Sequence, residues 1–273
     1  GQCLQKISSQ FEEYEFIFTD SETLDITNKE EVNDFFWQNA PDFCINAAAY
    51  TAVDLAETEV EKAFLVNADG TENLAEACAE NNAQFIHVST DYVFDGENNL
   101  AYTEEDFTNP LGVYGASKLA GDELALEVNP CSVILRTSWV YSEFGKNFVK
   151  TMLNLFATKE ELSIVADQFG QPTNANDLAE AIMKIIKSEK ITPGIFNFSN
   201  LGRISWFDFA EKIAELSDAK IKLNAIETSQ YPTPAKRPKN SVLDLDKISK
   251  TYAIQLKPWE ESLEDCVQIL QNN

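Results

Sequence analysis

Short apolar segments alternate with longer segments of helical periodicity in the first half of the chain, and this alternation constrains the fold most. The apolar runs are PDFCINAAA (residues 41–49), QFIHVS (84–89) and CSVILRTSW (131–139). Helical patterns lie between them, over about residues 60–80 and from about Tyr114 onward. Strands that alternate with helices of this length form parallel sheets covered by helices on both faces. We therefore predict an α/β fold with a Rossmann-type, doubly wound parallel sheet.

The elements predicted after residue 139 are smaller and more interrupted. Helical patterns cover NFVKTMLNLF (147–156), DLAEAIMKIIKS (177–188) and SWFDFAEKIAELS (205–217), a last helix starts near Trp259, and LSIVAD (162–167) and GIFNFSN (194–200) are predicted strands. We predict a dinucleotide-binding domain over residues 1–140. Residues 141–273 are expected to form mainly a smaller α/β substrate-binding portion, with some later segments returning to the first domain.

Composition excludes several classes of function. The formal net charge of −24 repels nucleic-acid backbones and anionic membrane surfaces, so we expect neither as a partner. No apolar run approaches the roughly 20 residues that span a bilayer, and no signal peptide is visible. The five cysteines are scattered without a C-x-x-C pair, which favours free thiols in the cytoplasm. The single histidine, His87, lies in an apolar run, which favours a core position and excludes histidine-rich metal sites.

The first twenty residues contain two features of a dinucleotide site. Gly1 stands directly before a helical pattern, where the last glycine of a phosphate-binding loop belongs, and Asp20 ends the predicted strand YEFIFTD (14–20). An acidic residue at that distance hydrogen-bonds an adenosine ribose. A strand and glycine loop normally precede the helix, so we expect the natural chain to extend upstream by roughly a dozen residues. The alternative is a chain that begins at Gly1 and binds no dinucleotide.

Three residues suggest carbonyl chemistry. Thr90 follows the apolar run 84–89, and Tyr114 and Lys118 are four residues apart on one helical face. An ammonium group beside a phenol lowers the phenol pKa, so we expect Lys118 to shift Tyr114 toward the working pH. Tyr114 would then pass a proton to a developing alkoxide that the Thr90 hydroxyl also holds. The alternative is a solvated tyrosine–lysine pair on a surface helix, because Y-x-x-x-K alone is a common pattern.

The order of several longer motifs resembles one family. The chain is similar to the extended short-chain dehydrogenase/reductase superfamily and, within it, to the dTDP-4-dehydrorhamnose reductases. The matching segments are NAAAYTAVDLAE (46–57), VNADGTENLA (66–75), STDYVFDG (89–96), NPLGVYGASKLAGD (109–122), LRTSWVY (135–141), NFVKTML (147–153), DQFGQPT (167–173) and YPTPAKRPKNS (231–241). They span most of the chain, and together they are far more specific than the three residues above.

The resemblance implies NADPH- or NADH-dependent reduction of the C4 ketone of dTDP-4-dehydro-L-rhamnose. It implies Tyr114 as proton donor, assisted by Lys118 and Thr90. The cofactor contacts that it implies are Gly1, Asp20, Asp25, Ile26, Ala47, Ala49, Thr51, Asn67, Tyr114 and Lys118. The sugar-nucleotide contacts that it implies are Val53, Thr90, Asp91, Trp139 and Arg237. Trp139 could instead be a core aromatic residue. Arg237, in the basic segment PAKRPKN, would face the diphosphate or lie in a solvated loop.

The sequence departs from the resemblance at one further point. Some relatives dimerise through a metal held by glutamates, but Cys3 and Asn176 stand at two such positions. We therefore expect no metal, and a monomer or weak homodimer. Asp20 would repel a 2′-phosphate, so NADH should compete well with NADPH. The alternatives are a related sugar-nucleotide reductase, or a non-catalytic regulatory subunit on the same fold, which would not need the Tyr114–Lys118 spacing.

Overall fold

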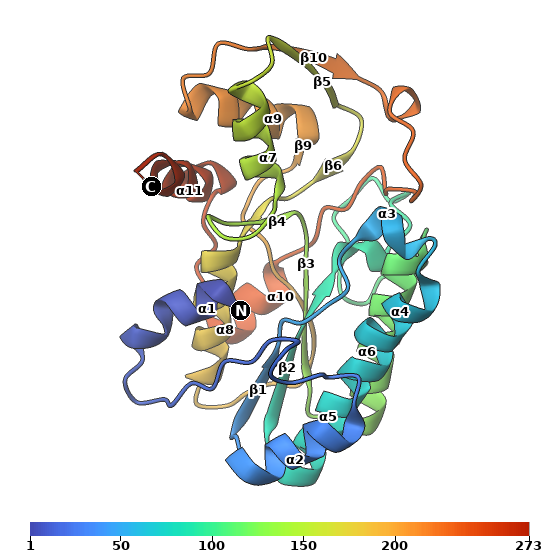
Figure 1. The fold of residues 1–273 in the computed structure, drawn as a ribbon, viewed down its shortest axis with the longest axis vertical. Helices are drawn as coiled ribbons and strands as arrows, with labels where there is room; N and C mark the ends of the chain where they lie inside the picture. Colours follow the sequence, from blue (N-terminus) through green and yellow to red (C-terminus); the bar gives the residue numbers. More distant parts are fainter. Residues whose placement is uncertain (273) are drawn as a thin grey trace.

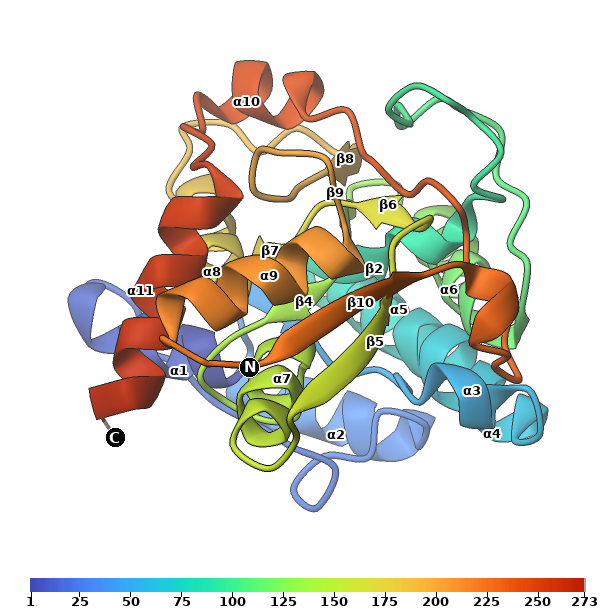
Figure 2. The same cartoon turned by 90° about the horizontal axis from the view of Figure 1, so that it is seen from above.

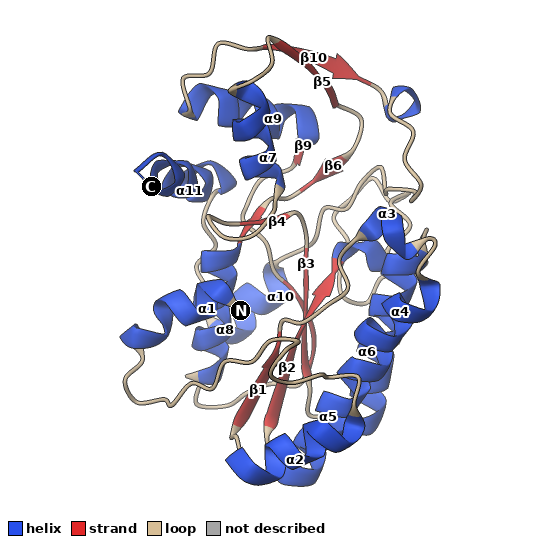
Figure 3. Ribbon diagram, viewed as in Figure 1, coloured by secondary structure: helices blue, strands red, loops and turns tan. Residues whose placement is uncertain are grey.

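A four-stranded parallel sheet forms the centre of the larger part of the molecule (Figures 1 and 3). The computed structural model describes residues 1–272. The strand order is β1-β2-β3-β8, and the bounds are Phe43–Asn46 (β1), Gln84–Thr90 (β2), Val133–Thr137 (β3) and Gly194–Asn197 (β8). All three pairings are parallel. The predicted α/β class with a parallel sheet is confirmed.

Helices cover both faces of this sheet, because alternate residues of each buried strand point to opposite faces. On one face, Ile86, Leu135 and Phe196 pack against helices α1 and α8. On the other, Phe85 and Ile134 pack against α2 and α5. Figure 1 shows the two helical layers on either side of the strands. The helices are α1 (Gln2–Ile7), α8 (Ala175–Ile186) and α10 (Asp246–Tyr252) in one layer, and α2 (Lys29–Asn39), α5 (Gly70–Asn81) and α6 (Val113–Val128) in the other.

The predicted strand over residues 14–20 is wrong. Residues 14–20 form no strand, because no strand within residues 1–272 runs beside them to accept their ladder hydrogen bonds. Ile17 is half exposed there, and Phe16, which packs against the edge of the core, stacks on Phe18. The cap of α2 is Asn28, whose side chain accepts from the Glu31 N–H. The neighbouring Thr27 donates its hydroxyl to Asp25.

The predicted helix over residues 60–80 contains a π-helical turn. Helix α4 (Val60–Phe64) passes through the turn Leu65–Asp69 (η2) into α5. The turn presses the Asn67 backbone against α6, where Gly121 has no side chain to obstruct it. A β-carbon at Gly121 would lie only 2.1 Å from the Asn67 carbonyl oxygen. This glycine therefore sets how closely α6 packs on the turn.

Several of the remaining elements form a second layer around their own core, seen from above in Figure 2. Strands β5 (Glu161–Val165) and β10 (Lys222–Ile226) pair in parallel. The core includes Phe209 and Leu263, on the helices α9 (Trp206–Leu216) and α11 (Trp259–Asn272), with α7 (Phe148–Phe156) beside them. The short elements are α3 (Val53–Ala56), β4 (Val140–Tyr141), β6 (Phe169–Gly170), β7 (Thr173–Asn174), β9 (Ile204–Ser205), η1 (Ser8–Gln10), η3 (Asp91–Val93) and η4 (Thr228–Gln230).

The hydrophobic core around the parallel sheet contains segments from both halves of the chain. Strand β8 and helices α8 and α10 come from the second half of the chain but pack with the parallel sheet. None of the helices formed by residues 1–272 is both long enough and apolar enough to cross a membrane.

Candidate active site

The structure brings Thr90, Tyr114 and Lys118 together at the carboxyl end of β2. Thr90 is the last residue of β2, and Tyr114 lies in the first turn of α6. The close approach of this turn requires Gly115, where a β-carbon would lie 2.2 Å from the Tyr92 carbonyl oxygen. The Lys118 ammonium nitrogen reaches back under the sheet edge, 2.9 Å from the Val88 carbonyl oxygen. Ligands bind at this edge of parallel sheets.

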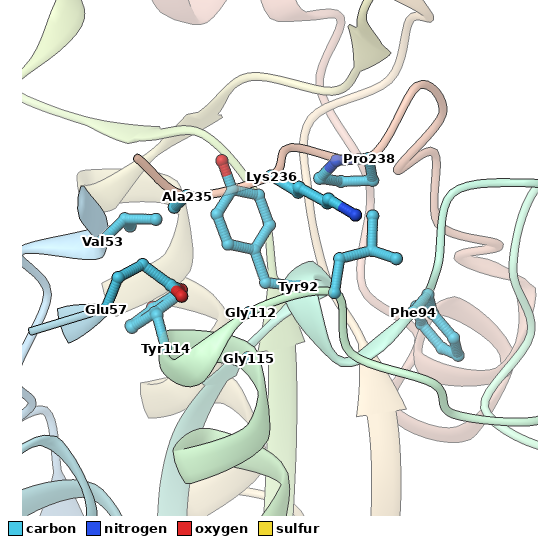
Figure 4. A pocket seen from close by; sticks show the side chains of 11 residues that line it. Val53, Glu57, Tyr92, Phe94, Gly112, Tyr114, Gly115, Ala235, Lys236 and Pro238 are labelled. Carbon is cyan, nitrogen blue, oxygen red and sulfur yellow. The ribbon is translucent and has the colours of Figure 1, made fainter. Parts of the chain in front are cut away.

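A cavity lies directly beside Tyr114. Figure 4 shows Tyr114 and Glu57 opposite the loop that carries Ala235, Lys236 and Pro238. The full lining is Val53, Glu57, Tyr92, Phe94, Leu111, Gly112, Tyr114, Gly115, Ala235, Lys236 and Pro238. Glu57 also fixes the start of α6, because its carboxylate accepts from the Val113 N–H at 2.9 Å. The cavity therefore joins the catalytic helix to residues more than a hundred positions away in sequence.

The pKa values of Tyr114 and Lys118 differ from those expected from the sequence. Burial raises the pKa of Tyr114 to about 12, with the Thr90 hydroxyl acting in the opposite direction. Burial also lowers the pKa of Lys118 to about 8, against the attraction of Asp122. The prediction that the pKa of Tyr114 is shifted toward working pH is wrong here, because burial is the largest cause and moves this pKa upward. Tyr114 is consequently a neutral phenol at working pH, which is the form that can give up a proton.

Asp91 presents a buried carboxylate next to Thr90. One of its oxygens accepts from the Thr90 hydroxyl at 3.0 Å. The other, Oδ2, is buried and forms no well-aligned hydrogen bond within residues 1–272, although the Ser241 hydroxyl lies close enough to this carboxyl to lower its pKa. Burial raises the pKa of Asp91 to about 6, with hydrogen bonds acting to lower it. A buried oxygen without a partner costs free energy, so this atom is suited to accept a hydrogen bond from a bound ligand.

The loop after β1 supplies the residues expected to line a cofactor channel. Ala47 and Thr51 are exposed, whereas Ala49 is half-buried. Asn67 holds this loop: its amide accepts from the Tyr50 N–H at 2.8 Å and donates to the Tyr50 carbonyl at 3.1 Å. The same amide donates to the Ser117 hydroxyl on α6. Asn67 therefore positions the loop against the catalytic helix and has no group left for a ligand.

The predicted adenosine contacts lie outside this cluster. Asp20 and Asp25 are exposed and bind neighbouring hydroxyls, those of Thr23 and Thr27. Ile26 is half-buried and backs Gly70 at the start of α5. Gly1 is exposed at the N-terminal end of α1. No hydrogen bond within the described part of the chain joins any of these four residues to Thr90, Tyr114 or Lys118.

Only some of the predicted sugar-nucleotide contacts lie at the cavity. Val53 lines the cavity, whereas Trp139 and Arg237 do not. Trp139 has a left-handed backbone, with φ of 47°, and its ring stacks on Trp206 with centroids 3.5 Å apart. Arg237 forms two hydrogen bonds with Asp54, at 3.1 and 2.8 Å, which joins the basic loop to α3. Its charge is thus already paired.

Sequence reasoning identified Val53 and Tyr114 of the cavity lining and missed the others, among them the polar residues Tyr92, Lys236 and Glu57. Tyr92 lies inside the STDYVFDG segment, and Lys236 lies beside Arg237 in the basic segment, so both had a signal. Glu57 had none, because its role depends on where α6 begins in space. Lys236 is exposed and supplies an ammonium group at the cavity.

The comparisons with known proteins agree with this geometry. The family model of the RmlD substrate binding domain matches residues 1–272. The dTDP-4-dehydrorhamnose reductase of Aggregatibacter actinomycetemcomitans is 45% identical, over 97% of this chain and 94% of the relative. The chain belongs to the dTDP-4-dehydrorhamnose reductase family.

Solved structures of the family have the same fold. A dTDP-4-dehydrorhamnose reductase from Clostridium acetobutylicum is 41% identical with a TM-score of 0.95, covering 99% of this chain and 95% of that one. The Bacillus anthracis enzyme, solved in complex with NADP, is 38% identical with a TM-score of 0.94, covering 98% and 96%. The resemblance inferred from the sequence motifs is confirmed, and so is the Rossmann-like architecture.

Cys3 and Asn176, the two residues that stand where some relatives have metal-binding glutamates, both lie near Glu143 in this reductase. The Asn176 amide donates to one oxygen of Glu143 at 2.9 Å, and Lys6 binds the other oxygen at 2.5 Å. These bonds hold the pKa of Glu143 below its ordinary value, although burial acts to raise it. Cys3 is buried beside them. Among residues 1–272, no group of three or more histidine, cysteine, aspartate or glutamate side chains could hold a metal ion.

Proposed function

We propose that this chain reduces the C4 ketone of dTDP-4-dehydro-L-rhamnose to dTDP-L-rhamnose with NADPH or NADH, a step of nucleotide-sugar synthesis for cell-surface polysaccharide. The observation that carries the proposal is the placement of Tyr114 in the lining of a cavity, with the Thr90 hydroxyl next to its phenol, in a chain of the reductase family. An active-site tyrosine kept as a phenol is suited to proton donation. A regulatory subunit would have no use for it.

The residues at the carboxyl ends of β1 and β2 fit the nicotinamide end of a dinucleotide. Three successive alanines, residues 47–49, follow β1 and leave space at the sheet edge, and Ala47 is exposed. Asn67 keeps their loop in place, and Lys118 lies below with its nitrogen near Val88. Lys118 and Thr51 would hold the nicotinamide ribose side. When bound, the reduced cofactor supplies a hydride to the substrate carbon.

Tyr114 and Thr90 supply the remaining chemistry. As negative charge develops on the ketone oxygen, the Tyr114 phenol donates its proton and the Thr90 hydroxyl donates a hydrogen bond. Thr90 now donates to Asp91 at 3.0 Å, so binding requires its hydroxyl to turn toward the substrate. The tyrosine pKa of about 12 matches a weak acid that protonates an alkoxide but not the ground-state ketone.

The sugar nucleotide would lie between α3 and the loop of residues 231–239. Val53 would contact the sugar, and the free Oδ2 of Asp91 would accept from a sugar hydroxyl. We assign the diphosphate to Lys236 together with Arg237, because these cations lie on the loop that faces Tyr114. Trp139 would contact the sugar from the second layer after leaving its stack with Trp206.

The proposal extends to the setting of the enzyme. We propose a cytoplasmic reductase that acts as a monomer or weak homodimer without metal. The five free cysteines support a reducing compartment. The pairing of Glu143 with Lys6 supports the absence of a metal bridge, because the lysine already supplies the compensating charge.

The direct test is cofactor oxidation by the purified protein. Nicotinamide absorbance is followed with dTDP-4-dehydro-L-rhamnose and, separately, with its UDP analogue, using NADH and NADPH in turn. We expect oxidation with the dTDP substrate. Oxidation only with the UDP compound would reassign the enzyme to another sugar nucleotide. Binding of both ligands without oxidation would favour a regulatory subunit.

A further inference from the structure

His87, the only histidine of the chain, lies buried directly below Lys118. Its Nε2 is 2.9 Å from the Lys118 nitrogen, and its Nδ1 is 3.0 Å from the Asn46 side-chain nitrogen. None of the proposed chemical steps uses this ring. Burial, with the charge of Lys118 as a second cause, holds its pKa well below the ordinary value, so the ring is neutral. A neutral imidazole carries one proton, on either Nδ1 or Nε2.

Two independent contacts fix the orientation of the Asn46 amide. Its oxygen accepts from the Ala48 N–H at 3.0 Å, and a nitrogen could not do so. Its nitrogen lies 3.3 Å from the Thr71 hydroxyl oxygen. The Thr71 hydroxyl already gives its proton to the Asn67 carbonyl at 2.8 Å, so it can only accept from Asn46. The amide nitrogen of Asn46 must therefore face His87.

The imidazole proton must then be on Nε2. Because Asn46 donates to Nδ1, Nδ1 is the acceptor nitrogen of the ring. Asp122 supports this assignment, since its unpartnered Oδ1 lies 3.8 Å from Nε2 and attracts a proton there. The Nε2–H thus points at Lys118, whose nitrogen can accept only as a neutral amine.

We propose that His87 is a positioning residue that favours the neutral amine form of Lys118 over its ammonium form, through an Nε2–H whose direction Asn46 dictates. The inference rests on the proposed function for its catalytic meaning, because Lys118 matters through the reduction. Charging Lys118 turns Nε2 into an acceptor and moves the imidazole proton to Nδ1. That proton then opposes the N–H of Asn46, so the ammonium form loses one hydrogen bond.

Other charged groups around Lys118 do not replace this effect. Asp122, one turn further along α6, favours the ammonium, but Arg136 on β3 pairs with Asp122 at 3.3 Å. Asp91 on η3 lies near the neutral Tyr114, whose pKa its charge raises. The ring of His87 is the only side chain within the described residues that hydrogen-bonds the Lys118 nitrogen. Hydrogen bonding to the neutral form of a base lowers its pKa.

The first test is the tautomer of His87 in the free protein. With ¹⁵N-labelled histidine, a long-range ¹H–¹⁵N spectrum shows two ring nitrogens that need no residue assignment, because the chain has one histidine. Above the Lys118 pKa of about 8, we expect a protonated, pyrrole-like Nε2 and a pyridine-like Nδ1. A proton on Nδ1, or a charged ring, overturns the proposal.

The second test separates positioning from a merely structural role. In His87→Gln the amide oxygen can accept from the Lys118 ammonium, so we expect the Lys118 pKa to rise by about one pH unit, the worth of one hydrogen bond. It is read from ¹³C-lysine spectra, with Lys118→Met identifying the signal, and from the pH profile of kcat/KM. The control, Ile86→Val, alters the same strand toward the opposite face and should leave this pKa unchanged.

An unchanged Lys118 pKa in folded His87→Gln overturns the proposal, as does an equal rise in Ile86→Val. Both NMR readouts use the protein without substrate. If they succeed while the dTDP sugar is not reduced, the proposed function fails and the role of His87 stands. If reduction occurs with the imidazole proton on Nδ1, the proposal about His87 fails alone.

Discussion

The packing of α6 on the π-helical turn predicts a large effect for Gly121→Ala. Helix propensity alone would make this change stabilising by about 1 kcal/mol. The new β-carbon, however, would lie 2.1 Å from the Asn67 carbonyl oxygen, a backbone atom that cannot rotate away. Normal contact requires a retreat of about 1 Å. Overpacking of this kind costs about 1–3 kcal/mol, and the severity of the contact places it at the upper end. We expect a net loss of about 2 kcal/mol.

The same shift should reduce activity. Asn67 joins the Tyr50 backbone to Ser117 on α6, so a displaced α6 carries Tyr114 and Lys118 away from Thr90. A misplacement of about 1 Å in catalytic groups can cost 10²-fold in rate. Urea unfolding gives the stability and cofactor oxidation gives kcat/KM. The control, Ala120→Gly on the same helix, should lose about 1 kcal/mol by propensity and keep most of its rate. A Gly121→Ala protein more stable than wild type would refute the reasoning.

Three further predictions concern the site. Tyr114→Phe should lower turnover by about 10²–10⁴-fold, while a fluorescence titration should show unchanged cofactor affinity. Near-normal turnover would show that Tyr114 is not the proton donor. Arg237→Ala should weaken sugar-nucleotide binding, measured by calorimetry, without changing NADH affinity. A loss of NADH affinity would mean that the loop of residues 231–239 contacts the cofactor instead. Asp91 has a pKa of about 6 in the folded state against 3.8 in the unfolded state, so it binds more protons when folded. Wild type should therefore lose up to about 3 kcal/mol of stability relative to Asp91→Asn as pH rises from about 4 to 6. A stability difference between the two proteins that does not change with pH would contradict a pKa raised by burial.

The parallel sheet and its carboxyl edge could be predicted from the sequence because buried parallel strands have a recognisable composition. Strands buried on both faces are continuous apolar runs, so β2 and β3 were visible in QFIHVS and CSVILRTSW. Tyr114 and Lys118 were recognisable because helical spacing fixes which residues share a face. Residues 14–20 have the composition of a strand, but a strand also requires a neighbouring strand, which local sequence does not reveal.

The protonation of the site could not be predicted from spacing. The tyrosine–lysine interval suggested a mutual charge effect, whereas the pKa values of both groups depend on burial under β2 and α6. The pairing of Arg237 with Asp54 joins residues 183 positions apart and likewise depends on tertiary structure. His87 was expected in the core and lies there, fully buried. Its contact with Lys118 follows from the packing of α6 on the sheet, which neither segment alone indicates.

The central claim is that the chain reduces the C4 ketone of the dTDP sugar with Tyr114 as proton donor. Its most direct test uses a cofactor with deuterium in the transferable position of the nicotinamide, and locates the label in the product by NMR. The account predicts dTDP-L-rhamnose with deuterium at C4 and none elsewhere, formed by wild type and nearly abolished in Tyr114→Phe. Product without deuterium at C4, or equal labelling by Tyr114→Phe at the wild-type rate, would contradict it.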